Sequence, residues 1–61
     1  MKKWVYFNGA FVNTKKVTYL KVYDQIVIEL GSQGFNFNQR FESIEECQSE
    51  TVRLCNELGI D

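Results

Sequence analysis

Residues 43–60 of this 61-residue chain, SIEECQSETVRLCNELGI, decide its fold class because they predict a helix with both ends marked. Ser43 and Glu46 form a capping-box pair at the start, and Glu45 adds negative charge to the first helical turn. At the other end Gly59 suits the left-handed position that follows a helix, and Ile60 can close it with an apolar contact. We therefore expect a helix over about 44–58. One apolar stripe recurs along it at spacings of three and four, comprising Ile44, Cys47, Thr51, Leu54 and Leu58.

Upstream of this helix the apolar pattern changes to the two-residue period of strands. Residues 4–7 and 10–12 are rich in strand formers, and Asn8-Gly9 between them favours a hairpin with a type I′ turn. Residues 13–16 indicate a turn, and residues 31–34 indicate a loop. Further strands are predicted over 17–23, 25–30 and 35–38.

The expected fold is therefore α+β: an antiparallel meander of four or five strands within about 3–39, followed by the C-terminal helix packed on one sheet face. Residues 1–61 are expected to form a single small domain. Alternation assigns a core beneath the helix, whereas both faces of the first hairpin are apolar and the pattern does not choose between them. The predicted core comprises Leu20, Val22, Ile26, Ile28, Leu30, Phe35 and Phe37, packed against Ile44, Leu54 and Leu58.

A second, uncovered sheet face is the most informative feature of the sequence. Monomers rarely expose large contiguous apolar patches, so we expect this face to be buried against another surface or to bind a ligand. Three interpretations of this face remain possible. We favour a homodimer that buries it; the others are a sheet that closes into a small barrel and an exposed platform for a ligand. A homo-oligomer would also support a chain whose small core leaves little stability margin. The predicted binding or oligomer face comprises Trp4, Tyr6, Phe11, Tyr19, Lys21 and Tyr23.

The residues that carry chemistry are sparse, which excludes most enzyme classes. Histidine is absent, so the usual catalytic base is missing. Four-ligand Cys/His zinc sites are excluded as well, because Cys47 and Cys55 are the only cysteines. Their eight-residue spacing in a helix is too long for a disulfide, so we expect free thiols. We predict no enzyme activity, no catalytic residues, no metal and no cofactor.

The charges divide sharply along the chain. Residues 1–22 carry a charge of +5 and residues 23–61 a charge of −6. Such asymmetry indicates an anionic partner, a charge-complementary contact between copies, or two differently charged solvated surfaces. No segment is apolar enough to span a membrane or to act as a signal peptide, so we expect a cytoplasmic protein.

The function class that fits these observations is a small non-enzymatic binding protein acting as a homo-oligomer, most simply a dimer. It would serve as an inhibitor or adaptor that occupies another protein's surface. The alternative is a single-stranded nucleic-acid-binding module, in which aromatic side chains stack on bases and lysines contact phosphates. The sequence isoelectric point of about 5.3 weighs against nucleic acid.

Overall fold

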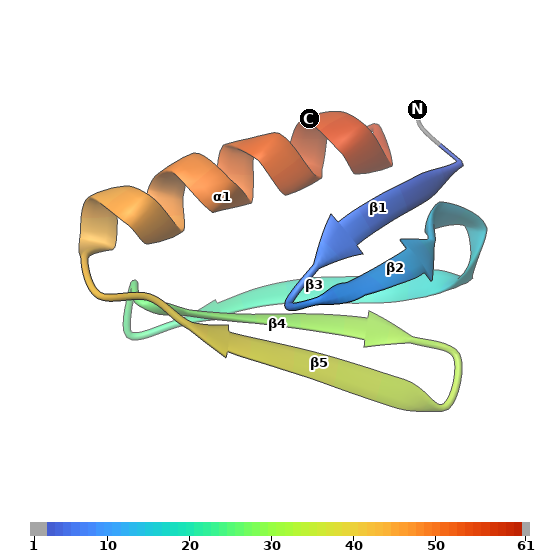
Figure 1. Cartoon of the computed structure of the whole chain (residues 1–61), viewed down its shortest axis with the longest axis horizontal. Coiled ribbons are helices and arrows are strands. Elements are labelled where there is room, and N and C mark those ends of the chain that lie inside the picture. Colours follow the sequence, from blue (N-terminus) through green and yellow to red (C-terminus); the bar gives the residue numbers. More distant parts are fainter. Residues whose placement is uncertain (1–2, 61) are drawn as a thin grey trace.

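A computed structural model describes residues 3–60 and confirms the α+β class (Figure 1). The described chain ends in one long helix, α1 (Ile44–Leu58), and a short 3-10 helix, η1 (Thr14–Lys16), interrupts the strands. The strands are β1 (Trp4–Phe7), β2 (Ala10–Asn13), β3 (Val17–Tyr23), β4 (Val27–Ser32) and β5 (Phe35–Arg40).

The prediction of one continuous meander is wrong, because the five strands form two antiparallel sheets. β1 pairs with β2 in one sheet, and β3, β4 and β5 follow each other in the second. The division falls at η1, where the Asn13 side chain accepts a hydrogen bond of 3.0 Å from the Lys15 backbone N–H. This cap starts a helical turn immediately after β2, so the chain leaves the first hairpin before β3 begins.

The first hairpin follows the prediction in turn and register. Asn8 and Gly9 both have positive φ, +50° and +79°, as a type I′ turn requires. Across the turn Phe7 pairs with Ala10 and Tyr6 with Phe11. The two-residue Asn-Gly turn therefore fixes which residues of the hairpin share a face.

The predicted bounds of the fourth strand are shifted. Asp24 and Gln25 both adopt positive φ, and the Ile26 N–H donates to the Tyr23 carbonyl over 3.0 Å. Ile26 therefore belongs to the turn, and β4 begins at Val27. At its other end β4 includes Gly31, which was expected in a loop, together with residue 32. The connection to β5 is shortened to residues 33–34.

Helix α1 begins and ends where its caps predict. The Ser43 side chain accepts a hydrogen bond of 3.1 Å from the Glu46 N–H. Gly59 has a φ of +76°, its N–H donates to the Asn56 carbonyl, and the Ile60 N–H donates to the Cys55 carbonyl over 2.8 Å. These two bonds form the Schellman motif, which satisfies carbonyls that the end of a helix leaves without partners.

The core lies between α1, the first hairpin and the inner face of the three-stranded sheet (Figure 1). Three predicted core residues are exposed instead: Val22 at 43%, Phe35 at 71% and Ile44 at 45%. Phe35 and Ile44 are the first residues of their elements, and Val22 lies near the end of β3. All three therefore lie at the periphery of the packed core, where fewer side chains bury them. The buried core comprises Val5, Phe7, Val12, Ile28, Leu30, Cys47, Leu54 and Leu58.

Candidate functional site

The first hairpin has one buried and one exposed face, which settles the ambiguity that the sequence left. Val5, Phe7 and Val12 point into the core and are 0%, 0% and 4% exposed. The residues that alternate with them are Trp4, Tyr6 and Phe11, which are 50%, 53% and 72% exposed. We call these three side chains the aromatic hairpin face.

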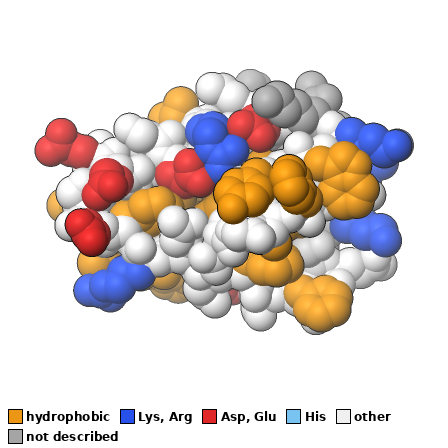
Figure 2. All heavy atoms as spheres, in the orientation of Figure 1, with side chains coloured by type: hydrophobic (Ala, Val, Ile, Leu, Met, Phe, Trp, Pro, Cys, Tyr) orange, Lys and Arg blue, Asp and Glu red, His pale blue; other side chains and the backbone are white. Residues whose placement is uncertain are grey.

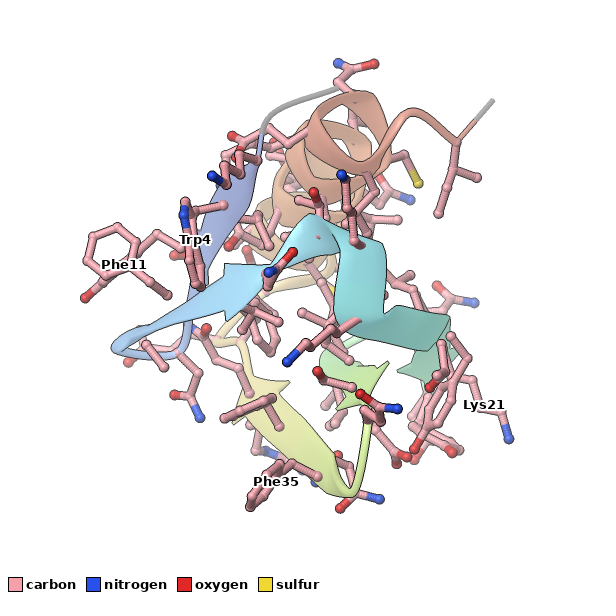
Figure 3. The ribbon with its side chains drawn as sticks, turned by 90° about the vertical axis from the view of Figure 1, so that its right-hand side faces the viewer. Trp4, Phe11, Lys21 and Phe35 are labelled. Carbon is pink, nitrogen blue, oxygen red and sulfur yellow. The ribbon has the colours of Figure 1, made fainter. Side chains whose placement is uncertain are left out.

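The aromatic hairpin face is ordered by contacts within it. Tyr6 and Phe11 are directly opposite in the ladder, and their rings meet edge to face with centroids 5.2 Å apart. This is a favourable geometry for two aromatic rings. Figure 2 shows the hydrophobic side chains gathered over β1 and β2, and Figure 3 shows Trp4 and Phe11 on the same side of the molecule.

Arg53 of α1 joins the helix to this hairpin. Its Nη2 donates to the Tyr6 carbonyl oxygen over 2.8 Å, while its Nε and Nη1 donate to Glu50 and Glu57 over 2.7 and 2.9 Å. The hydrogen bond to Glu50 raises the pKa of Arg53 further above its already high ordinary value. Burial partly opposes this rise, and the hydrogen bond to Glu57 adds to it. The guanidinium therefore fixes β1 against α1 and presents the aromatic rings on a supported backbone.

The hairpin turn is also tied to the second sheet. Asn8 Nδ2 donates to the backbone carbonyl of Asn38 in β5 over 2.8 Å. The bond occupies a carbonyl on the edge of β5, because β5 pairs with β4 on its other side. The aromatic hairpin face is therefore anchored at two points, by Arg53 and by Asn8.

The other three residues of the predicted face lie elsewhere. Tyr19, Lys21 and Tyr23 are on β3, and Figure 3 shows Lys21 on the opposite side of the molecule from Phe11 and Trp4. The structure therefore divides the six predicted residues into two groups of three. What each group binds stays a prediction.

The β3 group belongs to a polar cluster on the outer face of the three-stranded sheet. The Tyr19 hydroxyl donates to Glu29 Oε2, and Asn36 Nδ2 donates to the Tyr19 hydroxyl over 3.3 Å. The Lys21 ammonium lies 5.3 Å from the centroid of the Tyr19 ring, within the range of a cation–π contact. Sequence reasoning did not single out Glu29 or Asn36, although the alternation placed them on this face.

Tyr23 adds a titratable group to this cluster. Desolvation raises the pKa of Tyr23 above its ordinary value of 10.0, and the nearby negative charge of Glu29 raises it further. Because the pKa is raised in the folded chain, the resulting stabilisation is complete below the unfolded pKa and is lost as pH rises through the folded pKa. The free energy of unfolding should therefore fall in alkaline solution, beginning near pH 10.

We expect Glu29→Gln to lower the pKa of Tyr23 toward its ordinary value, because the neighbouring negative charge is removed. The measurement is a titration of phenolate absorbance in the ultraviolet, with Tyr23→Phe identifying which of the three tyrosines is observed. A Tyr23 pKa that is unchanged in Glu29→Gln would show that Glu29 has no part in the shift.

A cleft of about 460 Å³ lies between the end of β3 and α1. Its walls include the exposed apolar side chains of Val22 and Val52, and the buried Cys47 contributes to its lining. Cys47 and Cys55 are both free thiols. The remaining lining residues are polar: Gln25, Gln48 and Thr51.

Across residues 3–60, no group of three or more His, Cys, Asp or Glu side chains is placed to hold a metal ion. In the same part of the chain no helix is long and apolar enough to cross a membrane. Glu46 near the start of α1 accepts a hydrogen bond from the Ser43 hydroxyl and belongs to the helix cap.

Comparison with known proteins gives no information on what this site does. No protein-family model matches the chain, and neither a curated protein nor a solved structure matches it.

Proposed function

We propose that this chain is a non-catalytic interaction protein that binds another protein through the aromatic hairpin face. The observation that carries the proposal is the exposure of Trp4, Tyr6 and Phe11 beside a core that already holds Val5 and Phe7. The core is packed without these three exposed rings, so a binding role would account for their exposure. Tryptophan and tyrosine are enriched among the residues that dominate binding energy in protein interfaces.

The support beneath the rings strengthens the proposal. Arg53 holds the β1 backbone at Tyr6, and Asn8 holds the turn on β5. A surface fixed before binding loses less conformational entropy when a partner arrives. The partner that fits is a protein with an apolar recess wide enough for the rings, and the chain would occupy that recess as an inhibitor or adaptor.

Acidic side chains give the partner a second feature to recognise. Figure 2 shows them gathered over the start of α1, on the same face of the molecule as the aromatic rings. Glu45 and Glu46 are exposed there, and neither takes part in the Arg53 ion pairs. We therefore expect basic side chains beside the apolar recess of the partner, because complementary charge speeds encounter and selects orientation.

The test is to compare the proteins retained from host extract by the immobilised wild-type chain and by a Trp4→Ala/Phe11→Ala double variant. We expect a specific protein to be retained by the wild type and lost with the variant. With that protein purified, the double variant should weaken Kd at least about thirtyfold, because a hot-spot residue contributes about 2 kcal/mol or more.

Phe35→Ala is the matched control, because Phe35 is as exposed as Phe11 but lies on β5. Circular dichroism should show all these variants folded. A partner that binds the double variant as tightly as the wild type would contradict the proposal.

Single-stranded nucleic acid is the second candidate, favoured by the cations beside the rings. Lys3 adjoins Trp4 in sequence, and the exposed Lys15 and Lys16 follow β2 in η1. Trp4 is the only tryptophan, so its fluorescence reports directly on base stacking. Binding of an oligonucleotide that quenches this fluorescence and weakens steeply with salt would favour nucleic acid, whereas a protein partner held by apolar rings would tolerate salt.

A further inference from the structure

β3 leaves one edge of the three-stranded sheet open. β3 pairs with β4 on one side, and no other described strand pairs along its second side. It is also the longest of the described strands, with seven residues. An edge strand presents unpaired backbone N–H and C=O groups, which makes it a template for a further strand.

The surroundings of this edge suit an added strand. The cleft beside α1 opens next to Val22, so side chains of an added strand meet apolar surface as well as backbone groups. Proline and inward-pointing charges protect many edge strands, and β3 has neither. Two weaker protections are present: Lys21, which lies over the Tyr19 ring on the outer face, and the irregularity between Val17 and Tyr19, which leaves residues 19–23 in regular register. The backbone groups of this edge can therefore pair with an added strand.

We propose that the added strand is β3 of a second copy, paired antiparallel about a two-fold axis at Leu20. Pairing of this kind would join two three-stranded sheets into one sheet across the dimer. In this register Tyr19 lies opposite Lys21 of the other copy, and Lys16 lies opposite Asp24 of the other copy. Each contact occurs twice, because a two-fold interface repeats every pairing.

Charge complementarity selects the second copy as the occupant. Lys16 stands just before β3, where its carbonyl continues the β3–β4 ladder by accepting from the Gln33 N–H over 3.1 Å. Asp24 follows β3 directly, in the turn. Antiparallel pairing brings the basic end of one strand to the acidic end of the other. The charge division of the chain, +5 over residues 1–22 and −6 over the remainder, extends the same match.

Neighbouring registers lose this match. Moving the axis to Lys21 places two lysine side chains directly opposite each other, which is unfavourable. Moving it to Tyr19 separates Lys16 from Asp24 of the other copy. The irregularity between Val17 and Tyr19 displaces the start of β3 by one residue. A lysine side chain spans that displacement, so the Lys16–Asp24 contact survives it.

Sedimentation equilibrium from about 1 µM to about 1 mM tests the proposal, and we expect a dimer in the wild type. Lys16→Glu replaces two attractive contacts by two repulsive ones and should weaken dimerisation about tenfold, because exposed ion pairs contribute up to about 1 kcal/mol each. The double variant Lys16→Glu/Asp24→Asn removes the repulsion and should restore part of the affinity. Asn tolerates the positive φ of residue 24, so this second variant keeps the turn.

A direct reading of the register comes from nuclear Overhauser contacts between differently labelled copies. We expect a contact between Tyr19 of one copy and Lys21 of the other. A monomer throughout the concentration range would overturn the proposal. So would a dimer that Lys16→Glu leaves unchanged and Phe11→Ser dissociates, because that result places the interface on the aromatic hairpin face. Binding of a protein partner at that face is measured separately, so either proposal can fail while the other stands.

Discussion

Replacing Phe7 by Ala is expected to remove a large part of the free energy of unfolding, about 3–5 kcal/mol. Phe7 is fully buried, and truncating a buried Phe costs about 3–5 kcal/mol through lost apolar burial and the cavity that remains. A domain of this length has a free energy of unfolding of roughly 3–9 kcal/mol in total. Urea unfolding followed by circular dichroism measures the loss.

Phe11→Ala is the matched control on the facing strand of the same hairpin. Phe11 is 72% exposed and contacts the Tyr6 ring across the hairpin, so its removal should lower the free energy of unfolding by no more than about 1 kcal/mol. Equal losses for the two variants would mean that the inner and outer faces of the hairpin are assigned incorrectly, and the aromatic hairpin face would then belong to the core.

Replacing Gly31 by Ala should lower the free energy of unfolding by about 1–3 kcal/mol, the usual cost of crowding a packed site. A Cβ at this position would lie 2.1 Å from Cε1 of the Tyr19 ring, closer than two carbon atoms can approach. The ring would have to leave its place over β4, and its hydrogen bond to Glu29 would be lost. Thermal unfolding of the single variant measures the cost.

A double-mutant cycle isolates the cause of that loss. In a Tyr19→Ala background the obstructing ring is absent, so Gly31→Ala should be neutral or stabilising by up to about 1 kcal/mol. If Gly31→Ala is equally harmful with and without the ring, the cost arises in the backbone of β4, and the close packing of Tyr19 on Gly31 is not its source.

The elements that the sequence predicted correctly are those whose signals are local. Ser43 and Gly59 mark α1 because each satisfies backbone groups within one helical turn. Asn8-Gly9 marks the first hairpin because both residues tolerate the positive φ that its turn demands. Such signals act without help from the rest of the chain, so a short stretch of sequence contains them completely.

The features that the sequence did not predict depend on contacts between distant residues. Asp24 and Gln25 form a positive-φ turn without glycine, so the pattern placed Ile26 in a strand. Gly31 resembles a loop residue by composition, yet it lies in β4, where the Tyr19 ring packs on its bare backbone. Phe35 alternates like a core residue, but the core ends before it.

The sequence predicted which residues form the candidate site, but it did not predict how they are arranged on the folded chain. Both faces of the first hairpin are apolar, and only packing against α1 decides that Val5 points inward and Tyr6 outward. The polar cluster of Tyr19 depends on Glu29, ten residues away, which has no distinguishing local pattern. Sequence reasoning named the aromatic side chains and could not show that they divide between two sides of the molecule.

The division into two sheets also governs the order in which the chain can fold. Every strand pairing within residues 3–60 joins neighbours in sequence, so each hairpin can form by itself on a microsecond scale. The first hairpin, however, buries its apolar side against a core to which α1 contributes Leu54 and Leu58, and it contacts Arg53 across 47 positions. During synthesis the first hairpin must therefore wait for α1 to emerge before its inner face is shielded from water.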